Sequence, residues 1–143
     1  MGIEQETAVR SFLAETEGEK WDSARIERVL SHMAPDARYQ VFAWEEPLVG
    51  HDAIRADLHR QGQLFRDLQV VIVTIGSVGQ LVFTERQDSM TINGTAVTFH
   101  TAGVFEVDEA GKIAAWRDYL DSKEVETKVG AGVSSAGTRP ADR

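Results

Sequence analysis

Apolar side chains recur at three- and four-residue spacing along residues 1–33, a pattern typical of two amphipathic helices. Asp22 or Ser23 can cap the second helix, and Pro35 follows its end. Residues 50–65 repeat the helical spacing. The first half of the chain therefore predicts three helices, each with one apolar face that must pack against another element.

After these helices, and once between them, the pattern changes to runs that are rich in β-branched and aromatic residues. Asn93-Gly94 is the strongest hairpin signal in the chain and joins two of these runs. The run over residues 68–75 is almost continuous valine and isoleucine, which predicts a strand buried on both faces. The five predicted strands are residues 38–44, 68–75, 80–91, 95–107 and 112–120.

The order of these elements is helices, strand, helix and then an antiparallel meander. It predicts an α+β fold with the helices gathered on one face of a curved sheet. A short final helix is predicted over residues 122–129, and residues 130–143 are rich in Gly, Ser and Ala, which predicts a disordered tail. Because no internal repeat and no second apolar core is visible, we expect residues 1–129 to form one domain.

Composition narrows the chemistry that this domain can perform. The 143 residues include no cysteine, which excludes disulfide scaffolds, thiolate metal sites and cysteine nucleophiles. Fifteen Lys and Arg against 23 Asp and Glu give a net charge of −8, which disfavours binding to nucleic acid. No run approaches the roughly 18 apolar residues of a membrane span, and no secretory signal pattern begins the chain. We therefore expect a cytoplasmic protein that contacts neither nucleic acid nor membrane.

The histidines do not form a metal motif. His32, His51 and His59 lie in predicted helices without the spacing of a ligand pair that has a carboxylate nearby, so no metal is predicted. His100 lies on a predicted strand and is interpreted as a hydrogen-bonded structural residue. The chemistry is therefore expected to come from other polar side chains.

Alternation along the predicted strands places charged side chains among apolar ones, because residues two apart point to the same side, about 6.6 Å from each other. Arg86 and Asp88 share one face of their strand with apolar residues. Asp118 lies between Trp116 and Leu120 on its own face. A carboxylate in such a place is costly unless a positive group pairs with it.

If these strands are neighbours, an arginine flanked by two carboxylates lies inside the concave face of the sheet. The two carboxylates need not titrate alike, because burial, positive charge and mutual repulsion act on each of them differently. One can then act as a base and the other as an acid, as hydrolysis by paired carboxylates requires. Structural ion pairs at a sheet surface have the same spacing, and the residues alone leave both interpretations open.

Three blocks of the sequence resemble the limonene-1,2-epoxide hydrolase family in their order and spacing. They are residues 82–88 (VFTERQD), 103–107 (GVFEV) and 111–121 (GKIAAWRDYLD). The resemblance implies a nuclear-transport-factor-2-like fold, in which a strongly curved mixed sheet with helices on its concave side forms a deep, cone-like apolar pocket. It also implies a homodimer that hydrolyses a small apolar epoxide in one step without a cofactor.

The resemblance also implies a role for individual residues. Asp118 corresponds to the general base that activates water, Asp88 to the general acid that protonates the epoxide oxygen, and Arg86 to the bridge that orients both. Tyr39 corresponds to a tyrosine that helps to hold the water. The family has an asparagine two residues after this tyrosine, but this chain has Val41, which cannot hydrogen-bond to water.

Val41 leaves open which nucleophile attacks the epoxide. Water gives a vicinal diol, whereas a hydroxyl group of the same substrate gives a cyclic ether and makes the protein an epoxide-opening cyclase of natural-product biosynthesis. A non-catalytic module that binds a small ligand, and a ketosteroid-isomerase-like enzyme that moves protons, are further alternatives on the same fold. The predicted pocket residues are Val41, Leu58, Phe65, Met90, Phe99, Thr101, Trp116 and Leu120.

Overall fold

The computed structural model describes residues 2–129 of the chain, and over this range it contains four helices and six strands. The predicted tail, residues 130–143, lies outside the described residues. The helices are α1 (Gly2–Thr16), α2 (Ser23–Ser31), α3 (His51–Gly62) and α4 (Ser122–Val129). The strands are β1 (Met33–Gln40), β2 (Leu48–Val49), β3 (Phe65–Val78), β4 (Leu81–Ile92), β5 (Thr95–Val107) and β6 (Ile113–Tyr119).

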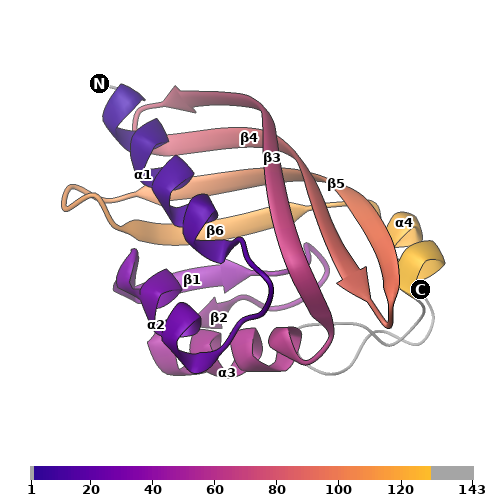
Figure 1. Cartoon of the computed structure of the whole chain (residues 1–143). Helices are drawn as coiled ribbons and strands as arrows, with labels where there is room; N and C mark the ends of the chain where they lie inside the picture. The colour runs from indigo at the N-terminus through magenta and orange to yellow at the C-terminus, as the bar shows by residue number, and fades with distance from the viewer. Residues whose placement is uncertain (1, 130–143) are drawn as a thin grey trace.

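The strands form one unclosed, curved sheet in the order β2-β1-β6-β5-β4-β3 (Figure 1). β1 and β6 pair in parallel, and the other neighbouring strands pair antiparallel. Figure 1 shows α1, α2 and α3 on one side of the sheet and α4 beside the first part of β5. The predicted α+β fold, a curved mixed sheet with helices on its concave side, is therefore confirmed.

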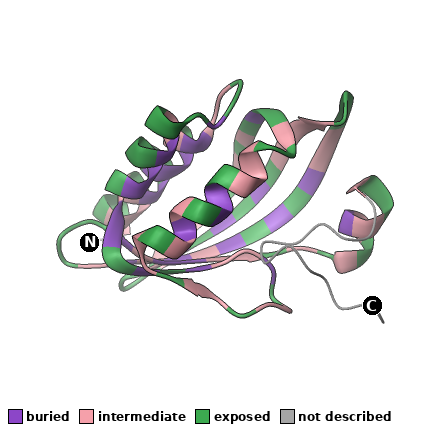
Figure 2. Cartoon of the chain, turned by 90° about the horizontal axis from the view of Figure 1, so that it is seen from below, coloured by how far each residue is buried: buried purple, intermediate pink, exposed green. Residues whose placement is uncertain are grey.

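The core fills the space between the sheet and the helices, because the helices turn their buried residues toward the strands (Figure 2). Phe12 of α1 packs edge to face against Trp116 of β6, with the ring centroids 4.9 Å apart. Phe105 of β5 completes this aromatic group, 6.1 Å from Phe12. Asp22 caps α2 as predicted, since its carboxylate accepts a hydrogen bond from the Arg25 amide at 2.9 Å.

The predicted hairpin is confirmed as β4 and β5. Asn93 and Gly94 have φ values of 52° and 80°, which are the positive values that a two-residue type I′ turn requires. Pairing then runs from Ile92↔Thr95 to Leu81↔Glu106 without a register shift. This unbroken register determines which side chains of both strands point into the concave face.

The first strand lies earlier in the chain than predicted. β1 ends at Gln40, so the predicted strand over residues 38–44 is wrong at both ends. Pro35 lies inside β1, at a point where the pairing with β6 shifts register, so the ladder does not need the N–H that proline lacks. After β1, the carbonyl of Phe42 accepts a hydrogen bond from the Glu45 amide and turns the chain away from the sheet.

The prediction that residues 68–75 are buried on both faces is also wrong. β3 is one of the two edge strands of the sheet, and Val71 and Val73 on its outer side are 54% and 53% exposed. Val70 and Ile72 face the other way and pack against the core. The continuous run of β-branched residues reflects strand propensity here. Because the helices cover only one side of the sheet, only the residues on that side are buried.

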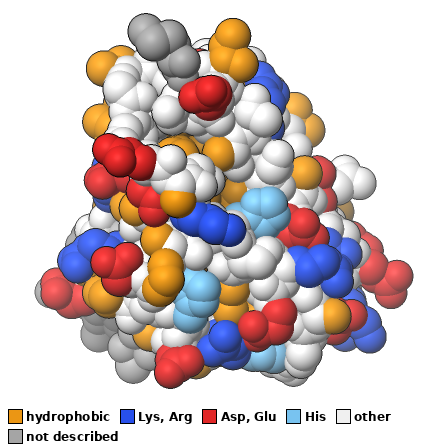
Figure 3. All heavy atoms as spheres, turned by 90° about the vertical axis from the view of Figure 1, so that its left-hand side faces the viewer, with side chains coloured by type: hydrophobic (Ala, Val, Ile, Leu, Met, Phe, Trp, Pro, Cys, Tyr) orange, Lys and Arg blue, Asp and Glu red, His pale blue; other side chains and the backbone are white. Residues whose placement is uncertain are grey.

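Charged side chains of both signs mix on the surface in Figure 3, where Asp and Glu alternate with Lys and Arg. Exposed ion pairs include Arg28–Glu15 at 2.9 Å and Arg55–Glu27 at 2.7 Å. The net negative charge is therefore not gathered into one patch on this face. Within residues 2–129, no helix is long and apolar enough to cross a membrane.

Candidate active site

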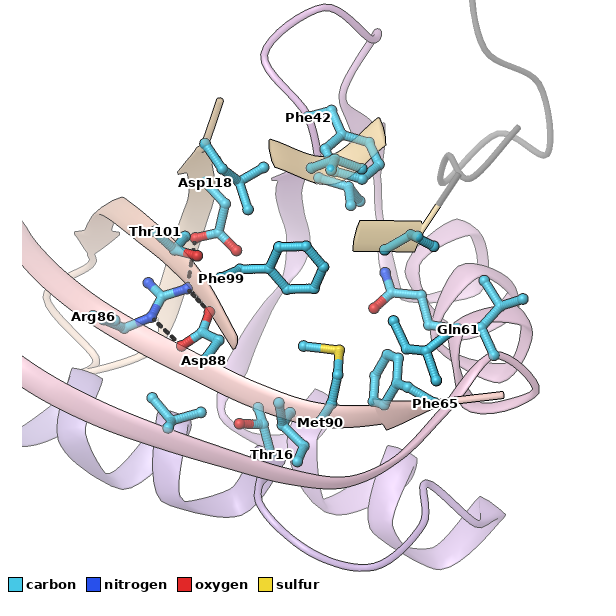
Figure 4. Close-up of a pocket in the computed structure, with 18 of the residues that line it drawn as sticks. Thr16, Phe42, Gln61, Phe65, Arg86, Asp88, Met90, Phe99, Thr101 and Asp118 are labelled. Atoms are coloured by element: carbon cyan, nitrogen blue, oxygen red, sulfur yellow. Dashed lines mark hydrogen bonds and ion pairs between the residues drawn. The ribbon is translucent and has the colours of Figure 1, made fainter. Parts of the chain in front are cut away.

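A cavity of about 210 Å³ lies between the concave face of the sheet and the helices. Its wall is mainly apolar, with a small group of polar residues at one end (Figure 4). An apolar cavity with a few converging polar groups is the usual form of a small-molecule site. The predicted pocket residues that line it are Val41, Phe65, Met90, Phe99, Thr101, Trp116 and Leu120.

Leu58 of α3 does not line the cavity, contrary to the prediction, because its side chain is fully buried in the core. Gln61, three residues further along the same helix, lies on the wall. Helical spacing predicts that Gln61 lies on the same face of α3 as Leu58. It does not predict which end of α3 reaches the cavity. The other lining residues that sequence reasoning missed are Leu13, Thr16, Trp21, Phe42, Arg60, Leu64, Leu68, Val70, Ile92, Asn93, Val125 and Val129.

Arg86, Asp88 and Asp118 meet at one end of the cavity (Figure 4). Arg86 donates to both carboxyl oxygens of Asp88, from Nε at 3.2 Å and from Nη2 at 2.9 Å. The same Nη2 donates to Oδ1 of Asp118 at 3.1 Å. The guanidinium is 2% exposed and the two carboxylates are 15% and 14% exposed. The structure therefore brings together the three charged residues that the strand alternation singled out.

The register of three strands creates this cluster. Gly103 of β5 pairs with Thr84 of β4 on one side and with Asp118 of β6 on the other. Thr84 accepts a hydrogen bond from Nη1 of Arg86 at 3.1 Å, which holds the guanidinium over Gly103. A residue without a side chain is needed at this position, because the arginine crosses β5 to reach Asp118.

We expect the Gly103→Ala substitution to displace Arg86 and to lower both stability and activity. The added Cβ would lie 2.9 Å from Thr84 Oγ1, 3.1 Å from Asp118 Oδ1 and closer still to Arg86 Nη1. Such overpacking should cost about 1–3 kcal/mol in the free energy of unfolding, measured by urea denaturation. Gly76→Ala is the control, because a Cβ there meets nothing within 4 Å. Equal stability of the two variants would contradict the argument.

Burial and charge set the protonation of the cluster. Burial raises the pKa of Asp118, and the neighbouring Asp88 raises it further, although Arg86 and the Trp116 indole oppose the change. Burial disfavours the charge of Arg86, but Asp118 and Asp88 together raise its pKa, so the guanidinium stays positive. The cluster thus combines a fixed cation with a carboxyl group that binds a proton more readily than an exposed aspartate.

Tyr39 lies next to this cluster on β1. Its ring stacks on Trp116, with centroids 3.9 Å apart and planes at 12°, and the Trp116 indole donates to Asp118 Oδ1 at 3.0 Å. Gln61 donates from Nε2 to the Tyr39 hydroxyl at 3.2 Å. Burial raises the pKa of Tyr39 well above its ordinary value, so the hydroxyl keeps its proton. Tyr39 is therefore a neutral hydrogen-bonding group in the cavity wall.

The remaining ionisable residues do not suggest a metal centre. Within the range that the structure describes, no group of three or more His, Asp or Glu side chains is arranged to hold a metal ion. His100 is exposed and pairs with Glu124 of α4 at 3.0 Å, a contact that lowers the pKa of Glu124 to about 2. His100 thus links β5 to α4 and does not face the cavity.

Comparison with known proteins finds relatives of this chain in sequence and in structure. The family model described as the limonene-1,2-epoxide hydrolase catalytic domain matches residues 3–129. Epoxide hydrolase EphG of Mycobacterium tuberculosis is 33% identical over 114 residues, which are 80% of this chain and 71% of that protein. A solved structure of an LEH-like epoxide hydrolase from M. tuberculosis has a TM-score of 0.73 and 29% identity, covering 88% of this chain and 89% of that chain.

A more distant likeness concerns the fold alone. The structure of a putative SnoaL-like polyketide cyclase from Jannaschia has a TM-score of 0.76 at 17% identity, covering 92% of this chain and 94% of that chain. This structure, together with that of an NTF2-like protein from Burkholderia pseudomallei with a TM-score of 0.75, shows that the sheet and helices have the fold shared by nuclear-transport-factor-2-like and SnoaL-like proteins. Together with the match over residues 3–129, the identity to EphG shows that the chain belongs to the limonene-1,2-epoxide hydrolase family.

Proposed function

We propose that this protein adds water to a small apolar epoxide in one step and releases a vicinal diol. The family and the named epoxide hydrolase among its relatives support epoxide hydrolase activity in general. The observation that carries the finer proposal is the Asp88–Arg86–Asp118 cluster at the end of an apolar cavity. This arrangement offers a base and an acid to a substrate that the cavity wall shields from bulk water.

Asp118 is the better placed of the two carboxylates to act as the general base. The hydrogen bonds that it receives from Arg86 and Trp116 both end on Oδ1. Among residues 2–129 no protein donor meets Oδ2, so this oxygen is available to a nucleophile in the cavity. Its raised pKa makes it a stronger base than an exposed aspartate. Asp118 would take a proton from water while the water oxygen bonds to an epoxide carbon.

Asp88 would supply the proton that the opening ring requires. As the carbon–oxygen bond of the epoxide breaks, the electron pair goes to the oxygen, and Asp88 protonates it. With one proton on the two carboxyl groups, the cluster is neutral overall, which suits a buried site. After the reaction Asp118 holds a proton and Asp88 has lost one, and Arg86 links the two groups between which that proton returns. The proposal requires no cofactor.

Tyr39 would hold the attacking water beside Asp118. Its protonated hydroxyl can donate to the water oxygen, and the Trp116 ring on which it stacks also contacts Asp118. Val41, two residues along the chain, lines the cavity without a hydrogen-bonding group. The water would therefore depend on Tyr39 and Asp118 for its orientation.

Hydrolysis in solvent enriched in oxygen-18 tests the reaction type. We expect a panel of terpene and alkyl epoxides to include a substrate that gains one solvent oxygen per molecule in a single turnover, detected by mass spectrometry. Because one water adds across the ring, the product should be 18 Da heavier than the substrate in ordinary water. An Asp118→Asn variant measured in parallel separates enzymatic from spontaneous opening.

Intramolecular opening is the second candidate, and Val41 is the observation that favours it. An apolar side chain at this point of the wall suits a carbon chain of a folded substrate better than a water molecule. The same two carboxylates would then activate a hydroxyl group of the substrate. The product would be an isomer of the substrate without solvent oxygen, and that result would replace hydrolysis by cyclisation.

We also propose that the outer face of the sheet mediates a homodimer. Phe83 of β4 is 42% exposed, and Val71 and Val73, further along β3, are also exposed. An exposed apolar surface of this kind is typical of an interface between subunits. Analytical ultracentrifugation should give twice the chain mass of 15.8 kDa, and Phe83→Asp should return the protein to a monomer. A monomeric wild-type protein at micromolar concentration would contradict the proposal.

A further inference from the structure

A second polar network reaches the cavity from α3. Gln61 donates from Nε2 to Asp57 Oδ2 at 2.7 Å and to the Tyr39 hydroxyl at 3.2 Å. The other oxygen of Asp57 accepts from Nη2 of Arg60 at 2.8 Å. Asp57 is 4% exposed, so this carboxylate lies in the interior of the protein. The network links a buried charge on the helix to the wall of the proposed active site.

These contacts fix the orientation of the Gln61 amide. An amide nitrogen carries two hydrogens, and both are used, one by a carboxylate that can only accept and one by the tyrosine oxygen. The amide oxygen must then point the other way, and Figure 4 shows it on the cavity side of the side chain. Within residues 2–129 no protein donor contacts this oxygen, although Gln61 lines the cavity.

The same contacts leave the hydroxyl proton of Tyr39 available for a hydrogen bond. Because Gln61 donates to the Tyr39 oxygen, the hydroxyl proton of Tyr39 remains free for another acceptor. The Tyr39 ring is fixed by stacking on Trp116, and Trp116 in turn donates to Asp118. Asp118 and Asp57 both act on the Tyr39 hydroxyl electrostatically, which agrees with its position between the two networks.

We propose that Gln61, held by Asp57, is a positioning residue that orients the attacking hydroxyl group through Tyr39 and with its own amide oxygen. It would provide on the α3 side of the cavity the hydrogen bonds that Val41 cannot provide on the β1 side. The inference rests on the proposed function, since it needs an epoxide and a nucleophile in this cavity. It adds a third polar contact to the nucleophile besides Tyr39 and Asp118.

A double-mutant cycle between Gln61 and Tyr39 tests the proposal. We expect Gln61→Leu to lower kcat by about 10- to 100-fold while KM changes by less than about threefold, because the residue orients the nucleophile rather than binding the carbon skeleton. In a Tyr39→Phe background the same substitution should cost less than about threefold more, since much of its action passes through the missing hydroxyl. Gln63→Leu, at the exposed end of α3 and outside the cavity, is the control with wild-type kinetics.

The outcomes separate the inference from the proposed function. A loss confined to KM would overturn the positioning role, and equal losses of kcat in the wild-type and Tyr39→Phe backgrounds would overturn the action through Tyr39, while either result would leave the hydrolase intact. A wild-type protein that opens no epoxide would overturn the proposed function and this inference with it. Gln61→Met has the same unbranched length and repeats the measurement if the leucine variant does not fold.

Discussion

The Asp118→Asn variant is expected to lose at least about 100-fold in turnover number for epoxide opening, with its fold intact. Asparagine keeps the shape of the side chain and can still accept the hydrogen bonds from Arg86 and Trp116 on its oxygen. It cannot take a proton from the nucleophile at the position that Oδ2 now occupies. Steady-state kinetics on the substrate found in the epoxide panel measure the loss.

Stability distinguishes this loss of activity from a loss of structure. Burial raises the pKa of Asp118 in the folded state above its unfolded value, so the stability that this carboxyl contributes is present at low pH and is lost as the pH rises through the raised pKa. At pH 7 a neutral asparagine does not bear this cost. We therefore expect a melting temperature equal to or above that of the wild-type protein, whereas a lower one would assign Asp118 a structural role.

Asp88→Asn should show a loss in turnover of similar size, because the epoxide oxygen then lacks its proton donor. Asp36→Asn is the matched control for both variants, since Asp36 is an exposed residue of β1 outside the cavity. Near-normal turnover in either active-site variant would remove that residue from the mechanism. The absence of any turnover in the wild-type protein itself would favour a non-catalytic ligand-binding module.

Much of the fold follows from local sequence signals. The bounds of β5 and α4 agree with the predicted ones, and the Asn93-Gly94 turn fixes the hairpin, because these features depend on neighbouring residues. The position of β1 depends on pairing with β6, which is far away in the sequence, and a bulge there accommodates Pro35. The burial of β3 depends on its place at the edge of the sheet, which no local pattern encodes.

In the candidate site, too, some features depend on neighbouring residues and others on the pairing of distant strands. Alternation within one strand brings Arg86 and Asp88 to one face, so their pairing is visible in the sequence. Bringing Asp118 to the same guanidinium requires β6 beside β5 and a glycine at position 103 between them, which are properties of the register. Gln61 was missed for a similar reason, since helical spacing does not tell which end of α3 faces the cavity.

The largest effect on stability is expected from Arg86→Met. Methionine fills a similar volume but leaves Asp88 and Asp118 close together in a buried place without a counter-charge. Removing one partner of a buried ion pair costs about 3–5 kcal/mol in the free energy of unfolding. For a chain of this size the melting temperature should fall by roughly 10–20 °C. Arg66→Met, on the exposed side of β3, is the matched control and should change it little.

The pH dependence of the free energy of unfolding identifies why the Arg86→Met variant loses stability. Without the guanidinium, two carboxylates repel each other in a buried place and their ionisation disfavours the folded state, so the variant should lose stability as the pH rises from about 4 to 7. Denaturant unfolding at both pH values should therefore give a smaller deficit relative to wild type at the lower pH. A deficit that does not change with pH would mean that Arg86 stabilises the protein by packing against Phe105, whose ring centroid lies 5.9 Å away, rather than by charge.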